Sequence, residues 1–281
     1  MRILCLHGLG NNSEIMKHKI SQILQRSDLS WELYYLQGNE ICPPAPGSSK
    51  YPGPYFCYSR DFKASSMKLA HDLVHKTFNE QGPFDGVLGF SQGASVLLAY
   101  LLEQIAKSPS KPLPIQFAVF CSPVPPLATT SAYCQFVFGD LSPENQSRLR
   151  SSKDDQIDLL PDPARTTMSA IVGVLDEMEK VNRHSRKWFL DREPLEIPCG
   201  LRPEWYEARL RIPTLHVRAV DDSDVLKRCA FLAGSFCEPR ERVIFEHTAG
   251  HDFPRLESER KQLAIAIEQI ASAASSPRPK L

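Results

Sequence analysis

The segment Gly89-Phe90-Ser91-Gln92-Gly93 constrains the fold most, because it joins a segment that is typical of a strand to one that is typical of a helix. Residues 84–90 form a short apolar run typical of a buried strand, and residues 94–105 are rich in Ala and Leu and predict a helix. A chain can turn from a strand directly into a helix only where small residues flank the turn, since a Cβ there would contact the neighbouring elements. The pattern therefore predicts a sharp turn that places the hydroxyl of Ser91 at the end of a sheet.

Strand-like and helix-like segments alternate along most of the chain. Predicted strands cover residues 3–6, 31–36, 84–90, 115–120, 214–217 and 242–245. Predicted helices cover residues 15–24, 64–78, 94–105, 226–236 and 258–270. This alternation predicts an α/β fold with a mostly parallel sheet, helices on both faces and functional side chains at the carboxyl ends of the strands. Residues 38–61, rich in Pro, Gly, Ser and Tyr, are expected to form a long surface loop.

The stretch from about residue 123 to 211 is too long for an ordinary connection between two strands. Its middle, residues 166–190, carries apolar residues at helical spacing and lies between two Pro-rich segments. We therefore expect one domain over residues 1–281, with a helical cap inserted at about 123–211. The apolar stripe of this insert fits a cap over the sheet, and it equally fits packing within the insert itself.

Charge and composition narrow the class of partner. Thirty-three Lys and Arg residues balance thirty-three Asp and Glu residues, so nothing in the net charge favours nucleic acid or an anionic membrane. No signal peptide is expected from the opening residues, and the sequence contains no apolar run of the roughly eighteen residues that cross a bilayer. Its eight scattered cysteines are expected to be reduced and mostly buried. We expect a cytoplasmic protein whose C-terminal Pro279-Lys280-Leu281 is a frayed tail.

A serine hydroxyl is a poor nucleophile at neutral pH unless a base and an orienting acid assist it. After a strand-to-helix turn of this kind, an Asp and then a His are expected further along the chain. His251 lies in a Gly-containing loop past the last predicted strand, and we expect it to be the base. Asp222 follows the preceding predicted strand, and we expect it to orient His251. Asp221 and Asp224 remain alternatives, because spacing alone does not separate neighbours in one loop.

Two backbone amides are candidates for stabilising the negative charge that develops on a substrate oxygen. The amide of Gln92 lies at the amino end of the helix that follows Ser91. The segment Leu6-His7-Gly8-Leu9-Gly10, after the first strand, has the form of the H-G-x-G loops that supply a second donor, and we select the amide of Leu9. His7 is expected to brace this turn rather than to transfer a proton.

No metal or nucleotide cofactor is expected. His71 and His75 lie one helical turn apart, as do His247 and His251, but neither pair has the Glu of H-E-x-x-H or a third ligand nearby. The segment Gly8-Leu9-Gly10 lacks the third glycine of a dinucleotide-binding turn and the lysine of a phosphate-binding loop.

Four segments, taken in order, resemble the family of serine hydrolases found in fungi, with human relatives. They are residues 3–11, 89–94, 212–217 and 249–251. Two positions depart from the family: Ala219 stands where a Gly is usual, and Ala249-Gly250-His251 replaces the usual Gly-Gly-His. The resemblance implies an α/β-hydrolase fold and hydrolysis of esters or thioesters.

Some fungal members of this family are thioesterases that release a product from a polyketide synthase, like the enzyme of the lovastatin pathway. The resemblance implies that activity here, with an acyl or polyketide thioester as substrate and a carrier domain of the synthase as partner. An apolar cap would suit an acyl chain, which the stripe from Met168 to Val181 is then expected to contact. Replacing Met168, Ile171 and Leu175 with Asp is expected to change the chain-length preference. Two alternatives are a general carboxylesterase that acts on small free esters and a non-catalytic acyl-binding protein on the same fold.

Overall fold

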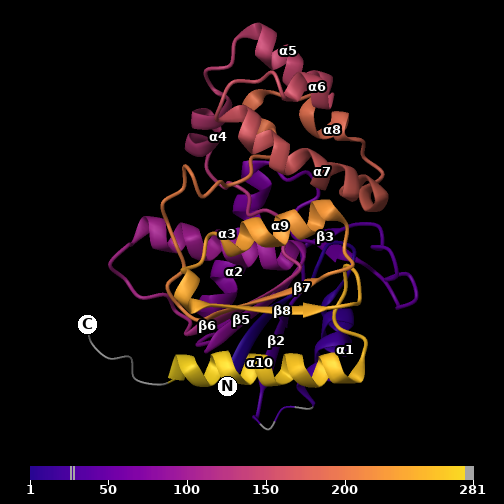
Figure 1. The fold of residues 1–281 in the computed structure, drawn as a ribbon, viewed down its shortest axis with the longest axis vertical. Coiled ribbons are helices and arrows are strands. Elements are labelled where there is room, and N and C mark those ends of the chain that lie inside the picture. Colours follow the sequence, from indigo (N-terminus) through magenta and orange to yellow (C-terminus); the bar gives the residue numbers. More distant parts are fainter. Residues whose placement is uncertain (26, 28, 276–281) are drawn as a thin grey trace.

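A parallel sheet of six strands forms the centre of the protein, in a computed structural model that describes residues 1–25, 27 and 29–275 (Figure 1). The strand order is β2-β1-β5-β6-β7-β8, and every neighbouring pair is parallel. The strands are β1 (Arg2–Leu6), β2 (Glu32–Leu36), β5 (Gly86–Phe90), β6 (Phe117–Cys121), β7 (Thr214–Ala219) and β8 (Arg242–His247). The predicted parallel sheet is confirmed, and the expected tail at residues 279–281 lies outside the described residues.

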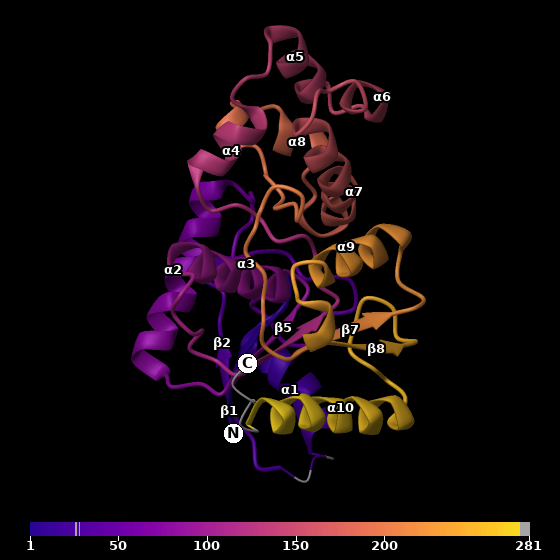
Figure 2. The ribbon, with the colours of Figure 1, turned by 60° about the vertical axis from the view of Figure 1, so that its left-hand side comes forward.

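Helices cover both faces of the sheet, as predicted (Figures 1 and 2). Side chains alternate between the faces: Leu4 and Leu6 join the core on one side, and Ile3 and Cys5 join the core on the other. Because helices cover both sides, the central strands β1, β5 and β6 are buried along nearly their whole length. The Ile3 side is covered by α1 (Ser13–Leu24) and α10 (Glu257–Ser275). The Leu4 side is covered by α2 (Ala64–Gln81), α3 (Gln92–Lys107) and α9 (Asp224–Gly234).

The chain between β6 and β7 forms a group of helices that stands above α9 in Figure 1; we call residues 123–211 the helical insert. The stretch at 166–190, which has apolar residues at helical spacing, contains more than one helix, because Arg183 follows the last residue of α7 in a left-handed backbone conformation with φ of 59°. The insert contacts the sheet region where α7 packs on α9. Its elements are α4 (Ser131–Phe138), α5 (Pro143–Ser151), α6 (Asp154–Ile157), α7 (Ala164–Asn182), α8 (Arg186–Leu190) and the 3₁₀ turn η1 (Pro194–Glu196).

Residues 38–61 differ from the expected surface loop. They contain two short antiparallel strands, β3 (Glu40–Ile41) and β4 (Phe56–Cys57). Residues 57–59 are completely enclosed, with exposed fractions of 0%. The Pro, Gly and Ser content correctly predicted turns, but burial of 57–59 comes from contacts with α3 and the loop after β1, which local composition does not report.

The structure also describes the state of the cysteines, the length and hydropathy of the helices, and the grouping of side chains that could bind a metal ion. All eight cysteines are buried and free of disulfides, as predicted. None of the helices in the described residues is both long and apolar enough to cross a bilayer. In the same residues, no three His, Cys, Asp or Glu side chains gather into a group that could hold a metal ion.

Candidate active site

Ser91 forms the turn between β5 and α3 in a backbone conformation that residues other than glycine rarely adopt, with φ of 51° and ψ of −116°. The glycines on either side make this turn possible. A Cβ on Gly93 would lie 2.5 Å from the carbonyl oxygens of Leu6 and His7, and a Cβ on Gly89 would overlap the backbone of Ala94. Strain of this kind costs about 1–3 kcal/mol and persists where the surrounding structure enforces it, as it does at many active sites.

Ser91, His251 and Asp222 form a continuous chain of hydrogen bonds. His251 Nε2 lies 2.9 Å from Ser91 Oγ, and His251 Nδ1 lies 2.9 Å from Asp222 Oδ2. The carboxylate is nearly enclosed, with 8% of its side chain exposed, whereas 29% of the histidine side chain is exposed. The three residues follow the carboxyl ends of β5, β8 and β7, so the parallel sheet brings together positions that are up to 160 residues apart. An imidazole held in this way can accept the serine proton while the acid keeps the ring oriented.

The structure distinguishes the three neighbouring aspartates. Asp221 Oδ1 accepts a hydrogen bond of 2.9 Å from the amide of Gly250, so it braces the loop that carries His251. Asp224 is 81% exposed and pairs with Lys227 at the start of α9. Asp222 is therefore the aspartate that contacts the imidazole, and its second oxygen accepts from the amide of Ser223 at 2.8 Å.

The loop that carries His251 is fixed by an ion pair and by aromatic packing. Asp252 pairs with Lys19 of α1 at 2.6 Å. Burial opposes ionisation of Asp252, but Lys19, the amide of Phe253 and Arg255 together outweigh it and hold the pKa of the carboxyl below its usual value. The ring of Phe90 lies 5.4 Å from the imidazole of His251 and 4.8 Å from the ring of Phe253. The loop of His251 is thus anchored to α1 and to β5, and the imidazole is also held by Asp222.

The two amides expected to hold a negative oxygen, those of Leu9 and Gln92, belong to residues that line the same pocket as Ser91. Neither amide donates a hydrogen bond to another residue in the described part of the chain. Both donors therefore remain available to a bound oxygen, the arrangement needed to stabilise a tetrahedral intermediate.

His7 is held as a neutral ring inside the structure. Its Nδ1 donates to the carbonyl of Gly8 at 2.8 Å, and its Nε2 accepts from the amide of Gly38 at 3.0 Å. Burial lowers the pKa of His7 to about 4. With both nitrogens occupied by backbone groups, the ring braces the turn after β1.

A pocket of about 320 Å³ opens beside Ser91 and lies between the sheet region and the helical insert. Its insert side is formed by one face of α7, through Val174, Met178 and Val181. The predicted apolar stripe from Met168 to Val181 lines the pocket in part: Met178 and Val181 do so, whereas Met168, Ile171 and Leu175 are buried in the core and do not. Helix α7 is apolar on two faces, and residue spacing alone does not show which face meets the pocket.

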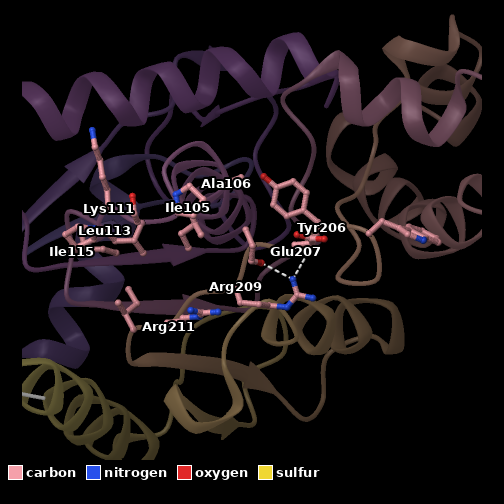
Figure 3. Close-up of a pocket in the computed structure, with 15 residues that line it drawn as sticks. Ile105, Ala106, Lys111, Leu113, Ile115, Tyr206, Glu207, Arg209 and Arg211 are labelled. Atoms are coloured by element: carbon pink, nitrogen blue, oxygen red, sulfur yellow. Dashed lines mark hydrogen bonds between the residues drawn. The ribbon is translucent and has the colours of Figure 1, made fainter. Parts of the chain in front are cut away.

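A second and larger hollow, of about 830 Å³, lies at the far end of α3 (Figure 3). Ile105, Leu113 and Tyr206 line it, together with the aliphatic part of Arg209. The guanidinium of Arg209 donates hydrogen bonds to the backbone carbonyls of Pro203, Tyr206 and Ala208. The lining contains no histidine and none of the predicted site residues, so the smaller pocket at Ser91 is the candidate active site.

Sequence reasoning missed Tyr58, which lies next to the candidate site and is completely buried. It contacts both the loop after β1 and the first residue of α3. The only sequence signal was an aromatic residue that follows two apolar ones, Phe56 and Cys57, inside a segment otherwise rich in turn formers.

Residues 1–263 match the family described as Serine hydrolase (FSH1). The chain belongs to this family. Among its relatives, the serine hydrolase cnsH of Penicillium expansum is 41% identical over 227 residues, which cover 81% of this chain and 94% of that protein. The esterase FPY3 of Fusarium mangiferae is 30% identical over 280 residues, which cover 98% of each chain. The protein is therefore a hydrolase, not the non-catalytic acyl-binding protein that the sequence left open.

Solved structures support the fold of this serine hydrolase. The monoacylglycerol lipase of Paleococcus ferrophilus superposes with a TM-score of 0.51 at 16% identity, over 96% of this chain and 94% of the lipase. The esterase RhEst1 of Rhodococcus superposes with a TM-score of 0.50 at 13% identity, over 98% of this chain and 91% of the esterase. At such identities the likeness concerns the fold alone, and it confirms the α/β-hydrolase architecture.

Proposed function

We propose that the protein cleaves acyl thioesters and esters through an acyl-enzyme formed on Ser91, with His251 as the base and Asp222 as its orienting acid. One observation carries the proposal: the unbroken hydrogen-bonded chain from Asp222 through His251 to Ser91, which ends beside a pocket. No metal or organic cofactor takes part in the proposed reaction.

In the first half-reaction, Ser91 Oγ attacks the acyl carbonyl while His251 Nε2 takes the serine proton. The carbonyl oxygen becomes negative, and the amides of Leu9 and Gln92 donate hydrogen bonds to it. His251 then gives the proton to the departing sulfur or oxygen, and the bond between that atom and the acyl carbon breaks. Asp222 stabilises the imidazolium that exists between these two proton transfers.

In the second half-reaction, a water molecule replaces the leaving group. His251 takes a proton from this water as its oxygen attacks the ester carbonyl on Ser91, and it returns the proton to Ser91 Oγ when the ester bond breaks. The products are a free acid and the regenerated enzyme.

We further propose that the helical insert acts as a cap that holds the acyl chain of the substrate. The support is the apolar face of α7, where Val174, Met178 and Val181 line the pocket that contains Ser91. Leu226 at the start of α9 and Phe62 extend this apolar surface. Burying an acyl chain there contributes about 0.8 kcal/mol for each methylene removed from water.

The finer proposal is that the enzyme is a cytoplasmic thioesterase that releases an acyl or polyketide product from the carrier domain of a synthase. It rests on the resemblance of the sequence motifs to the product-releasing members of the family. Because FPY3 of Fusarium mangiferae is named an esterase, an enzyme for small free esters is the second candidate.

Three substrates with one acyl chain separate the two candidates: the acyl group on a carrier domain, on N-acetylcysteamine and as an ethyl ester. A product-releasing thioesterase is expected to hydrolyse the carrier-bound substrate at least about tenfold faster than the ethyl ester, as judged by kcat/KM. A preference for the ethyl ester would favour the second candidate. Loss of turnover of all three in Ser91→Ala would assign them to the same site.

A further inference from the structure

The segment from residue 56 to 59 contacts both parts of the backbone that are proposed to hold the negative oxygen. It touches the loop after β1, which contains the amide of Leu9, and the start of α3, which contains the amide of Gln92. Nothing in the proposed chemical steps uses the side chains involved. These buried side chains connect the two backbone segments by hydrogen bonds, in addition to the pairing of β1 with β5 and the close packing of Gly93 against the carbonyls of Leu6 and His7.

The link to α3 is made by the side chain of Gln92. Gln92 Oε1 accepts a hydrogen bond of 2.9 Å from the amide of Tyr58, and Gln92 Nε2 donates one of 2.7 Å to the carbonyl of Ser59. The side chain is nearly enclosed, with only 3% of the residue exposed. Both polar atoms of the amide group are therefore committed to the backbone of residues 58–59, and neither points at a substrate.

The link to the loop after β1 is made by the hydroxyl of Tyr58. It donates to the carbonyl of Leu36 at 2.8 Å and accepts from the amide of His7 at 3.2 Å. Its ring also packs against the imidazole of His7, with centroids 5.0 Å apart. His7 lies two residues before Leu9, so this hydroxyl holds the turn that orients the Leu9 amide.

Residues 45 and 56 hold the other side of the same loop. The amide of Gly10 donates to the carbonyl of Phe56 at 3.0 Å, and the amide of Ala45 donates to the carbonyl of Gly10 at 3.0 Å. Gly10 has a φ of 67°, and a Cβ there would collide with the backbone of Ala45. His7 and Gly10, on either side of Leu9, are thus both hydrogen-bonded to residues 56–59, and the side chain of Gln92 is hydrogen-bonded to the same segment.

We propose that Tyr58 and the side chain of Gln92 are positioning residues that set the separation of the Leu9 and Gln92 amides. The inference rests on the proposed function, because it assigns these two amides to the negative oxygen of the intermediate. Hydrogen bonds to a developing charge are sensitive to placement, and a displacement of about 1 Å at a reacting centre can reduce the rate about 100-fold. A substitution at Tyr58 should therefore weaken binding of the transition state more than binding of the substrate.

The test is Tyr58→Phe, which keeps the ring and removes the hydroxyl that contacts His7 and Leu36. The matched control is Tyr100→Phe, since Tyr100 in the middle of α3 is also buried, at 3% exposed, and its hydroxyl contacts His75 of α2 at 3.1 Å. Each variant loses a buried hydroxyl from the same face of the sheet. Thermal unfolding of both variants measures their loss of stability.

Steady-state kinetics and a transition-state analogue give the decisive comparison. We expect Tyr58→Phe to lower kcat about 10- to 100-fold with KM changed less than about twofold, and Tyr100→Phe to leave both within about twofold. A trifluoromethyl ketone with the same acyl chain adds to Ser91 and forms a negative oxygen. Its inhibition constant should rise in Tyr58→Phe by the same factor by which kcat/KM falls.

Two results would overturn the inference: equal kcat values in Tyr58→Phe and Tyr100→Phe, or a fall in kcat with an unchanged inhibition constant. If Tyr58→Phe does not fold, Gln92→Met is compared with the control in the same way. Methionine has a length similar to that of glutamine but cannot make the hydrogen bonds to residues 58 and 59. An inactive wild type would contradict the proposed function itself. An active wild type whose Tyr58→Phe variant matches the control would contradict only the inference.

Discussion

The sheet region and the helical insert form opposite walls of one pocket by different physical means. On the sheet side, loops at the strand ends carry a serine and an imidazole that hydrogen bonds hold at fixed distances. The same side contains the two backbone amides that have no hydrogen-bond acceptor in the described residues. On the insert side, one helix presents aliphatic side chains, through Val174, Met178 and Val181. Directional bonds fix atoms for a reaction, whereas apolar packing fixes a volume into which different chains can fit.

This difference teaches where each kind of specificity resides. A change of one atom at the sheet edge should alter the rate of the reaction for every substrate. A change of one side chain on α7 should alter which substrates react and leave the chemistry intact. The predictions that follow separate these two outcomes, beginning with the largest effect.

The largest effect is expected from Asp222→Asn. An amide in place of the carboxylate favours the wrong imidazole tautomer and no longer stabilises the imidazolium, so kcat should fall about 10⁴-fold. Asp221→Asn should have a smaller effect through the Gly250 amide, and Asp224→Asn should have almost none, because that side chain is 81% exposed. Steady-state kinetics on one ester substrate measures all three. A larger loss in Asp221→Asn than in Asp222→Asn would contradict the assignment of the acid.

The insert should respond to Leu175→Ala by losing stability. Leu175 is 2% exposed and buried in the core, so truncation should cost about 2–5 kcal/mol of unfolding free energy. Hydrogen exchange followed by mass spectrometry should locate the loss in peptides from residues 123–211. For a short acyl substrate, kcat/KM should stay within about twofold of the wild type. A fall in kcat as large as the one expected for Asp222→Asn would contradict this account, because it would show that the insert affects the reaction at Ser91 as well as the volume of the pocket.

Mild acid should lower the free energy of unfolding through histidines that are buried in the sheet region. Burial lowers the pKa of His7 to about 4 and that of His216 to about 3, so both stay neutral in the folded protein while the unfolded chain binds protons below about pH 6.5. Stability is therefore complete above that pH and is lost as the pH falls toward 4, by about 1.4 kcal/mol per unit for each histidine. Urea unfolding at pH 7.5 and pH 5.5 measures the loss. His216→Gln should reduce this dependence without abolishing it, because burial also lowers the pKa of His71 and His247. An unchanged dependence would refute the burial argument.

The smallest effect is expected from Met178→Ala in the pocket wall. We expect kcat/KM for a long acyl chain to fall about tenfold, with little change for an acetyl substrate, because an acetyl group has no chain to contact the apolar wall of the pocket. The matched comparison is Met168→Ala, since Met168 is completely buried and does not line the pocket. Equal chain-length preferences in the two variants would contradict the assignment of the acyl site to this face of α7.

The sequence located the sheet side of the pocket well, because a sharp turn into a helix and loops after parallel strands have narrow chemical requirements. Glycines around Ser91, and polar residues directly after predicted strands, mark such positions in the sequence itself. The choice among Asp221, Asp222 and Asp224 needed coordinates, because adjacent residues differ only in the direction of their side chains.

The insert side was predicted much less completely. Apolar spacing indicated a helix but did not show that it ends at Arg183, or that Met178 rather than Leu175 meets the pocket. Tyr58 escaped detection for a related reason: its burial depends on partners 22 to 51 residues away, and its neighbours in sequence are turn formers. Such features follow from tertiary packing, which periodicity and composition do not report.

The central claim is that the sheet edge holds an activated serine. The direct test is to treat the purified protein with a fluorophosphonate probe and to identify the modified residue by mass spectrometry, with Ser91→Ala and His251→Ala as controls. The account predicts one modified residue, Ser91, whose labelling is lost in Ser91→Ala and strongly slowed in His251→Ala. Folded wild-type protein that remains unlabelled, or that is labelled equally fast without His251, would contradict it.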